Sequence, residues 1–162
     1  MKYFFKPKQF SLLFEWTITD ESGRRLFRIK ADLFTLGNRW CIYETEETST
    51  PFAILKNSLN PFSPITLRDS ENRIIGTLKD RWASWLKIGY DMVNTQGKVV
   101  LSANQTGRYD FNFFSGNLNI GTFRKIVKFG DRAILHLFAD DQERIDRRMV
   151  LGLVVALMWS GA

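Results

Sequence analysis

The carboxyl-terminal segment, RRMVLGLVVALMWSGA, constrains the fold more than any other part of the chain. Between Met149 and Trp159 only Gly152 interrupts the apolar side chains, so a helix formed here is apolar on every side and must be covered by something other than water. At about 1.5 Å per residue this run reaches about 16 Å, whereas a bilayer core about 30 Å thick needs about 20 apolar residues. The run therefore favours a helix buried inside protein over one that spans a membrane.

The residues before this run predict where the helix begins. Asp140, followed three positions later by Glu143, resembles a capping box with Asp in place of Ser or Thr. Acidic residues in a first turn also suit the positive end of the helix dipole. Asp140, Asp141 and Glu143 could instead hold a cation, but capping explains them without one. We therefore expect a helix that starts at Asp140 and no metal site.

The rest of the chain reads as β-structure because apolar and polar residues alternate. The segment FEWTIT places Phe14, Trp16 and Ile18 on one face, and RLFRIKA returns after the turn DESG. The same pattern pairs RWCIYE with PFAILK, ITLRD with RIIGTLK, WLKIGYDMV with KVVLSA, and YDFNFF with LNIGTFRKIV. With further strands at residues 3–5 and at RAILHLF, we count about twelve antiparallel strands.

The strand count and the apolar tail fit one architecture. About eight strands make a barrel that its own side chains fill, so about twelve enclose a wider space that needs an apolar filler. We predict a mainly β fold over residues 1–162, a single domain in which an antiparallel barrel of about twelve strands encloses the hydrophobic C-terminal helix. The aromatic side chains expected to point towards the axis are Phe14, Trp16, Phe27, Trp40, Phe52, Tyr109, Phe111 and Phe113.

The residue content excludes several classes of function. The single Cys41 cannot form an internal disulfide, and the opening MKYFFKPKQF has too short an apolar run for a secretory signal, so we expect a cytoplasmic protein. His136 is the only histidine and alternates with Leu135 and Leu137 in an expected strand, which favours a structural role. No phosphate-binding glycine loop or Cys/His cluster occurs in the sequence. We therefore expect a non-enzymatic protein with no cofactor.

Basic residues are the better candidates for a binding site. The chain carries 23 Lys and Arg against 17 Asp and Glu, a formal net charge of +6. Such an excess fits an anionic partner, although a plain solvated surface also fits. Arginine suits phosphate because its guanidinium donates two parallel hydrogen bonds. The candidate anion-binding residues form one strand group and one hairpin group: Arg25, Arg28 and Lys30, and Arg124, Lys125, Lys128 and Arg132.

The segment LKDRWASWLK is a further candidate, because it mixes large amphipathic rings with cations. Trp82 and Trp85 lie beside Lys79, Arg81 and Lys87. This combination is typical of an interfacial membrane contact, or of a stacking surface for single-stranded nucleic acid. A turn packed by its own tryptophans fits the same residues.

Three stretches near the amino end resemble motifs of the LURP-one-related family. Residues 6–11 match K-x-K-x-F-S, residues 16–23 match F-x-I-x-D-E-x-G with Trp16 in the first place, and residues 34–37 match F-S-L-G with Thr35 in the serine place. The resemblance extends over essentially the whole chain. It implies a twelve-stranded barrel threaded by a hydrophobic C-terminal helix, as in tubby C-terminal domains and phospholipid scramblases. Tubby domains bind phosphoinositides, but the sequence shows no scramblase-type calcium loop or Cys-rich stretch, so lipid scrambling is not expected.

Three hypotheses of function remain. The leading one is a non-enzymatic, tubby-like domain that binds an anionic phospholipid headgroup or another phosphate-bearing ligand on its basic surface, at the periphery of a membrane and without spanning it. The second is a protein-interaction or regulatory scaffold whose charge serves only solubility. The third is nucleic-acid binding around Trp82 and Trp85.

Overall fold

The computed structural model describes residues 1–8, 15–32, 39–44, 49–57, 64–126, 132–138 and 145–159. These residues form twelve strands and one helix. The strands are β1 (Lys2–Pro7), β2 (Glu15–Thr19), β3 (Arg25–Asp32), β4 (Arg39–Tyr43), β5 (Ala53–Lys56), β6 (Ile65–Arg68), β7 (Ile74–Ala83), β8 (Leu86–Asn94), β9 (Val99–Gln105), β10 (Asp110–Ser115), β11 (Leu118–Ile126) and β12 (Arg132–Leu137). The helix is α1 (Arg147–Trp159).

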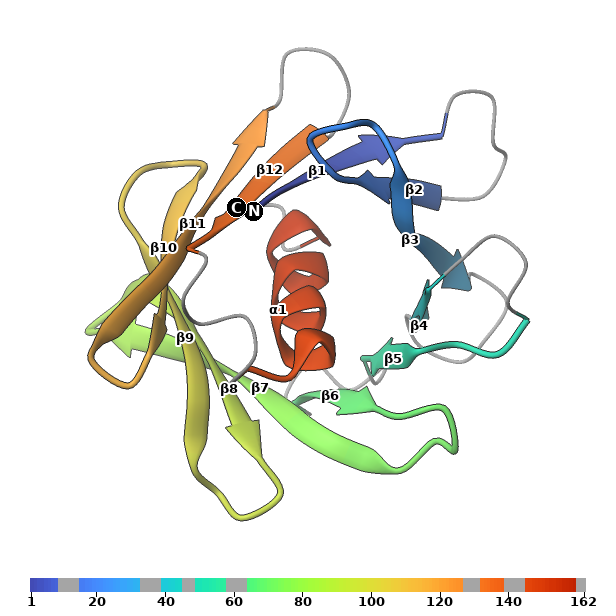
Figure 1. Ribbon diagram of the computed structural model, residues 1–162. Coiled ribbons are helices and arrows are strands. Elements are labelled where there is room, and N and C mark those ends of the chain that lie inside the picture. Colours follow the sequence, from blue (N-terminus) through green and yellow to red (C-terminus); the bar gives the residue numbers. More distant parts are fainter. Residues whose placement is uncertain are drawn as a thin grey trace.

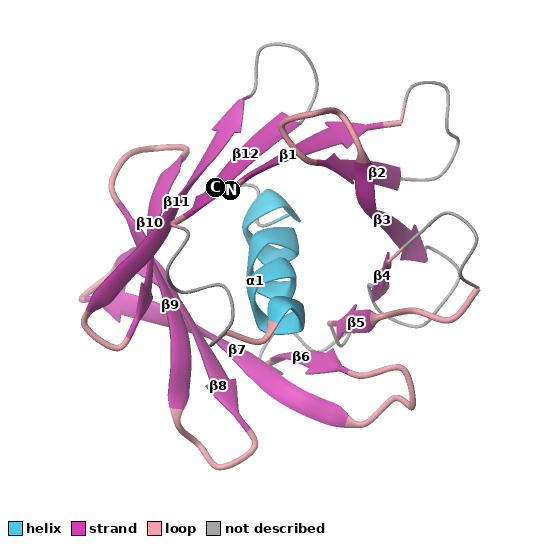
Figure 2. Ribbon diagram, in the orientation of Figure 1, coloured by secondary structure: helices cyan, strands magenta, loops and turns pink. Residues whose placement is uncertain are grey.

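The strands close into an antiparallel barrel around the helix (Figure 1). Each strand pairs with its neighbours in sequence, and β1 closes the ring by pairing with β12, where Tyr3 lies opposite Leu135. Closure gives each described strand a paired neighbour on both sides, which removes the long open edge that is the template for edge-to-edge aggregation. Figure 2 shows strands on all sides of the single helix. The predicted barrel of about twelve strands around a C-terminal helix is therefore confirmed.

The alternation of the sequence sets the two faces of the barrel wall. In β3, Phe27 and Ile29 are buried against the helix side, while Arg28 and Lys30 between and after them are half-exposed. The aromatic residues expected inside that are buried are Trp16, Phe27, Trp40, Phe111 and Phe113. Two of the others, Phe52 and Tyr109, are half-buried and lie outside the strands.

Phe52 and Tyr109 lie just before β5 and β10, so the in–out alternation of strand side chains does not determine which way they point. Phe52 is half-buried against the core, with its ring 5.8 Å from that of Phe27. Tyr109 is half-buried in the turn before β10, with the Arg108 guanidinium 5.3 Å from its ring centroid, so the expectation that it fills the core was wrong. Phe14 lies outside the described residues.

The helix begins at Arg147, later than predicted. Asp146 caps it: its Oδ1 accepts a hydrogen bond from the backbone N–H of Arg148 at 2.9 Å, and its carbonyl accepts one from Met149 at 3.0 Å. Asp140 and Glu143, the residues predicted to form the cap, lie outside the described residues, while Ile145 and Asp146 are not helical. Several acidic residues precede the same apolar run, so the sequence pattern did not separate one capping position from another.

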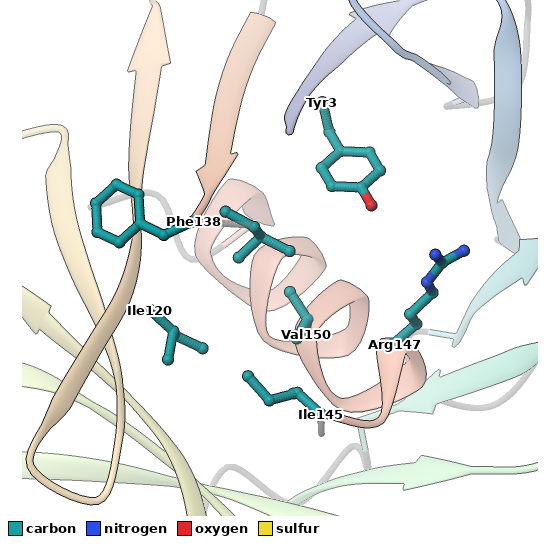
Figure 3. Close-up of a pocket in the computed structure, with 7 residues that line it drawn as sticks. Tyr3, Ile120, Phe138, Ile145, Arg147 and Val150 are labelled. Atoms are coloured by element: carbon teal, nitrogen blue, oxygen red, sulfur yellow. The ribbon is translucent and has the colours of Figure 1, made fainter. Parts of the chain in front are cut away.

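A small pocket lies beside the start of the helix (Figure 3). Its volume is about 20 Å³, room for little more than one water molecule. Burial raises the pKa of the Tyr3 hydroxyl, and the nearby guanidinium of Arg147 partly opposes that shift. A pocket of this size does not hold a cofactor. Its lining residues are Tyr3, Ile120, Leu137, Phe138, Ile145, Arg147 and Val150.

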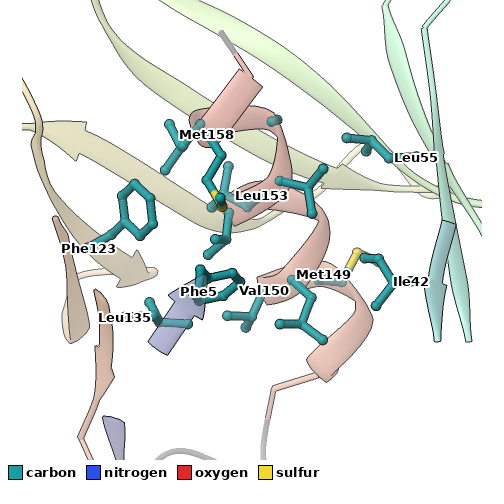
Figure 4. Close-up of a cluster of buried hydrophobic side chains, with 14 of the residues drawn as sticks. Phe5, Ile42, Leu55, Phe123, Leu135, Met149, Val150, Leu153 and Met158 are labelled. Carbon is teal, nitrogen blue, oxygen red and sulfur yellow. The ribbon is translucent and has the colours of Figure 1, made fainter. Parts of the chain in front are cut away.

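The apolar run of α1 fills the barrel. Its side chains are buried from Met149 through Met158, and Leu153 and Val154 are completely inaccessible to water. Figure 4 shows Phe5 and Phe123 on one side of the helix and Leu55 on the other. Each such side chain contributes about 1.5 to 3 kcal/mol when fully buried. In the described part of the chain, no helix is long and apolar enough to cross a membrane.

Gly152 allows the helix to approach β6 closely. A Cβ atom at this position would lie 2.8 Å from Cδ1 of Leu67, whose side chain is fully buried. The glycine that interrupts the apolar run therefore marks a contact with the barrel wall.

Replacing Gly152→Leu should lower the free energy of unfolding by about 1 to 3 kcal/mol, because the added side chain overpacks the site against Leu67. Leu67→Ala alone should cost about 2 to 5 kcal/mol through the cavity it leaves. In the double variant one change relieves the other, so the combined loss should be smaller than the sum of the two. Urea denaturation measures all three, and strictly additive losses would contradict the contact.

Candidate functional site

An up-and-down barrel brings alternate connections of the chain to the same end. Odd-numbered strands end, and even-numbered strands begin, at the end that we call the basic rim. We define the basic rim as the three residues of each strand nearest that end, together with the described loop residues between them. The helix also ends here, because Nζ of Lys125 donates a hydrogen bond to the carbonyl of Met158 at 2.9 Å.

Positive charge dominates the basic rim. Its described acidic residues are Glu15, Asp32 and Asp110. Its described basic residues are Lys6, Lys8, Lys30, Arg39, Lys56, Arg81, Lys87, Arg108, Arg124, Lys125 and Arg132. Some of these cations are neutralised locally, as in the pair between Nε of Arg124 and Oδ1 of Asp110 at 2.6 Å. The basic residues nevertheless far outnumber the acidic ones.

The opposite rim, where the helix starts, is nearly balanced in charge. Its described acidic residues, Asp20, Glu21, Glu44, Asp69, Glu71 and Asp146, face a similar number of basic ones: Lys2, Arg24, Arg25, Arg68, Arg73, Lys98, Arg147 and Arg148. Many are paired with one another, as Arg73 is with Asp69 at 2.9 Å. The excess positive charge of the described residues therefore gathers mainly at one end of the barrel.

The β7–β8 hairpin projects from the basic rim. β8 pairs with β9 only from Gly89 onwards, so Leu86 and Lys87 pair with β7 alone. Beyond this point the hairpin is a two-stranded ribbon that turns at Ser84, whose φ is 58°. We call residues 82–88 the Trp tip. Its large apolar side chains are exposed: Trp82 by 56%, Trp85 by 82%, Leu86 by 56% and Ile88 by 36%.

Lys87 places its own positive charge within the apolar Trp tip. Its Nζ lies 3.1 Å from Oδ2 of Asp80, donates to the Tyr90 hydroxyl at 3.2 Å, and sits 5.6 Å from the ring centroid of Trp82. Burial disfavours the charged amine, but the hydrogen bonds to Tyr90 and Asp80 outweigh it, so the pKa of Lys87 is raised. Lys87 therefore stays charged beside the tryptophan face.

The structure brings together candidate residues that the sequence treated separately. Arg124, Lys125 and Arg132 lie on the same rim as Trp82 and Trp85. The remaining member of that hairpin group, Lys128, lies outside the described residues. The Trp tip and the basic end of the β11–β12 hairpin thus belong to one candidate surface, the basic rim.

The strand group of candidates is divided. Lys30 lies at the basic rim, whereas Arg25 lies at the opposite rim. Arg28, midway along β3, has its Nε 3.9 Å from buried Glu15 and its guanidinium 4.8 Å from the Tyr43 ring centroid. Arg28 therefore interacts with neighbouring side chains of the barrel wall.

Sequence reasoning missed other basic residues of the rim, among them Lys6, Arg39, Lys56 and Arg108. Arg39, Lys56 and Arg108 are each isolated in their own stretch of sequence, and Lys6 has only Lys2 and Lys8 nearby. The only signal that could have found them is the alternation of hairpin ends, which assigns every second connection to one end of a closed barrel.

No catalytic or metal-binding group stands out among the residues that the structure describes. They contain no cluster of three or more His, Cys, Asp or Glu side chains suited to a metal. The ring of His136 contacts that of Phe138 edge-on at 5.2 Å on the outer wall. Burial raises the pKa of the Cys41 thiol, which disfavours a reactive thiolate.

The sequence matches the family described as LURP-one-related over residues 1–158. The chain belongs to the LURP-one-related family. This family lies within the superfamily of tubby-like and scramblase proteins. A comparison with curated proteins gives no match. Membership of the LURP-one-related family agrees with the barrel fold, and it does not by itself assign a ligand to the basic rim.

Quenching of tryptophan fluorescence by charged quenchers should report the positive charge around the Trp tip of this LURP-one-related protein. Iodide should quench Trp82 and Trp85 more strongly than caesium, because Lys87 beside the Trp82 ring attracts the anion. The fluorescence component of these two tryptophans is obtained as the difference between the wild type and a Trp82→Phe/Trp85→Phe variant. The iodide preference should shrink in Lys87→Gln and persist in Lys98→Gln, a charge removed from the opposite rim. Equal quenching of that component by both ions would count against a basic surrounding.

Proposed function

We propose that this protein binds the surface of anionic phospholipid bilayers through the basic rim, with the Trp tip seated among the headgroups. The observation that carries the proposal is the exposure of Trp85 and Trp82 on a projecting ribbon at the rim where basic residues predominate. Tryptophan favours the membrane–water interface because its ring is large, flat and amphipathic. An exposed apolar patch bordered by charge marks a surface that contacts a membrane or a partner.

The energetics of the Trp tip favour its transfer out of water. Trp85 is 82% exposed and so gains little from folding, whereas full burial of a large apolar side chain contributes about 1.5 to 3 kcal/mol. Leu86 next to it is also more than half exposed. Because the ribbon projects beyond β9, these side chains can enter an interface without any opening of the barrel.

The charges of the rim supply the attraction and the lipid selectivity. A cation near an anionic leaflet contributes about 1 kcal/mol, and this attraction falls off within the Debye length, about 8 Å at physiological ionic strength. Lysine and arginine on several connections of one rim can meet a flat surface together. We further propose that the protein is non-enzymatic and acts at the cytoplasmic leaflet, which carries the anionic lipids.

Sedimentation with vesicles tests the proposal. The protein should pellet with vesicles that contain phosphatidylserine, remain in the supernatant with pure phosphatidylcholine, and be released by high salt. Trp82→Ser combined with Trp85→Ser should weaken binding by about tenfold or more, since loss of about 1.4 kcal/mol suffices for that factor. The matched control is Leu118→Ser, which removes a side chain that is 55% exposed at the opposite rim and should leave binding unchanged.

Two single-charge variants distinguish binding by the basic rim from binding driven by the net charge of the whole protein. Arg132→Gln should weaken binding by about fivefold, the equivalent of about 1 kcal/mol, whereas Lys98→Gln at the opposite rim should have little effect. Equal losses would mean that overall charge, and not this rim, drives binding.

Two other outcomes would replace the lipid proposal. Equal recovery in the supernatant with both vesicle types would remove it. Capture of a protein partner that persists in high salt would then favour the scaffold hypothesis, and a salt-sensitive mobility shift with single-stranded nucleic acid, lost in the tryptophan variant, would favour stacking on bases.

A further inference from the structure

The Trp tip joins the barrel at one cross-strand row. Arg81 on β7 lies opposite Gly89 on β8, and Gly89 lies opposite Asn104 on β9. On the barrel side of this row β8 has a neighbour on each side, and on the far side only two strands continue. A two-stranded ribbon is marginally stable in water by itself. The direction of the Trp tip therefore depends on contacts made at the row.

Arg81 makes contacts there that cross the whole row. Its Nη2 donates hydrogen bonds to Oδ1 of Asn104 and to the carbonyl of Ala103, the latter at 3.3 Å. Its Nε is buried and lies 3.7 Å from Oδ1 of Asp91, which also accepts a hydrogen bond from Ser102 at 2.7 Å. One side chain on β7 thus connects to both β8 and β9.

Gly89 makes this reach possible. A Cβ atom at Gly89 would overlap the carbonyl oxygen of Ala103 and lie 2.7 Å from Nη2 of Arg81. With no side chain at the middle position of the row, the guanidinium of Arg81 can cross over β8 to Asn104. The row therefore combines a long hydrogen-bond donor on β7 (Arg81), a position without a side chain on β8 (Gly89) and an acceptor on β9 (Asn104).

The strand pairing changes at the same point. The β7–β8 register shifts between Arg81 and Trp82, which is the mark of a β-bulge. Bulges bend a strand and re-aim the side chains that follow. The extra residue is Ile88 on β8, because Arg81 pairs with Gly89 and Trp82 pairs with Lys87. Arg81 is thus the last residue of β7 before the bulge, and Trp82 is the first after it.

We propose that Arg81 is a positioning residue that fixes the Trp tip to the barrel wall in one direction, so that Trp82 and Trp85 meet a bilayer together with the basic rim. This role rests on the proposed membrane function. Ordering the ribbon before binding reduces the conformational entropy lost on contact, and so raises affinity without adding any contact to lipid.

The test compares variants that keep the charge with one that removes it. Arg81→Lys keeps the charge but loses the planar donor fork. Asn104→Ala removes the acceptor and leaves the charge of the rim unchanged. Lys79→Gln removes a charge from an exposed position on the same strand without touching the row. The readouts are amide hydrogen exchange over residues 82–88, the NMR order parameters of the Trp82 and Trp85 indoles, thermal stability, and binding to phosphatidylserine vesicles.

Arg81→Lys and Asn104→Ala should both speed exchange in the Trp tip and lower the indole order parameters, with the barrel amides still protected. Both should weaken vesicle binding about threefold to tenfold. Lys79→Gln, a charge removed from β7 outside the basic rim, should leave the tip ordered and vesicle binding nearly unchanged. A role confined to folding stability would instead lower the melting temperature and loosen the whole barrel.

Unchanged order in both row variants overturns the proposal, whatever the vesicle results. Loss of order with unchanged vesicle affinity also overturns it, because positioning would then not matter to binding. Failure of the wild type to bind vesicles removes the membrane function on which the role rests, while the exchange data still decide whether Arg81 orders the tip.

Discussion

The rest of the structure depends on the burial of a helix that has no polar side. Because α1 is apolar all round, it is stable only where protein surrounds it, and twelve strands provide a closed wall of the required width. The wall in turn has a filled core only because the helix occupies it. Leu67 against Gly152, and Met158 held by Lys125, fix the helix along the barrel axis.

This mutual dependence leaves the two rims free to differ. Strand pairing and the central helix hold the barrel together, so most residues in the described connections can vary without disturbing the core. One rim balances its charges through pairs such as Asp69 with Arg73. The other carries an excess of lysine and arginine and also bears the Trp tip. The barrel is therefore a rigid support whose two ends differ in charge.

Within the basic rim, the roles of cation and ring are separate. In the proposed membrane contact, lysine and arginine spread over several connections would give long-range attraction that depends on salt, while the exposed Trp82 and Trp85 would make short-range apolar contact. Lys87 and Arg81 lie where the two meet. Lys87 pairs with Asp80 and sits beside a tryptophan face, and Arg81 connects the hairpin to β9.

The sequence by itself determined the barrel and its helix, because alternation with period two and an apolar run too short to cross a bilayer are local patterns. It also marked Trp82, Trp85, Arg124 and Lys125 as candidates. It did not determine the start of the helix at Arg147, since acidic residues that can cap precede the run at more than one position. Only the tertiary structure decided that Lys6, Arg39 and Arg108 lie at the same end of the barrel as the Trp tip, and that Arg25 does not, because strand direction and closure bring to one end residues that are far apart in the chain.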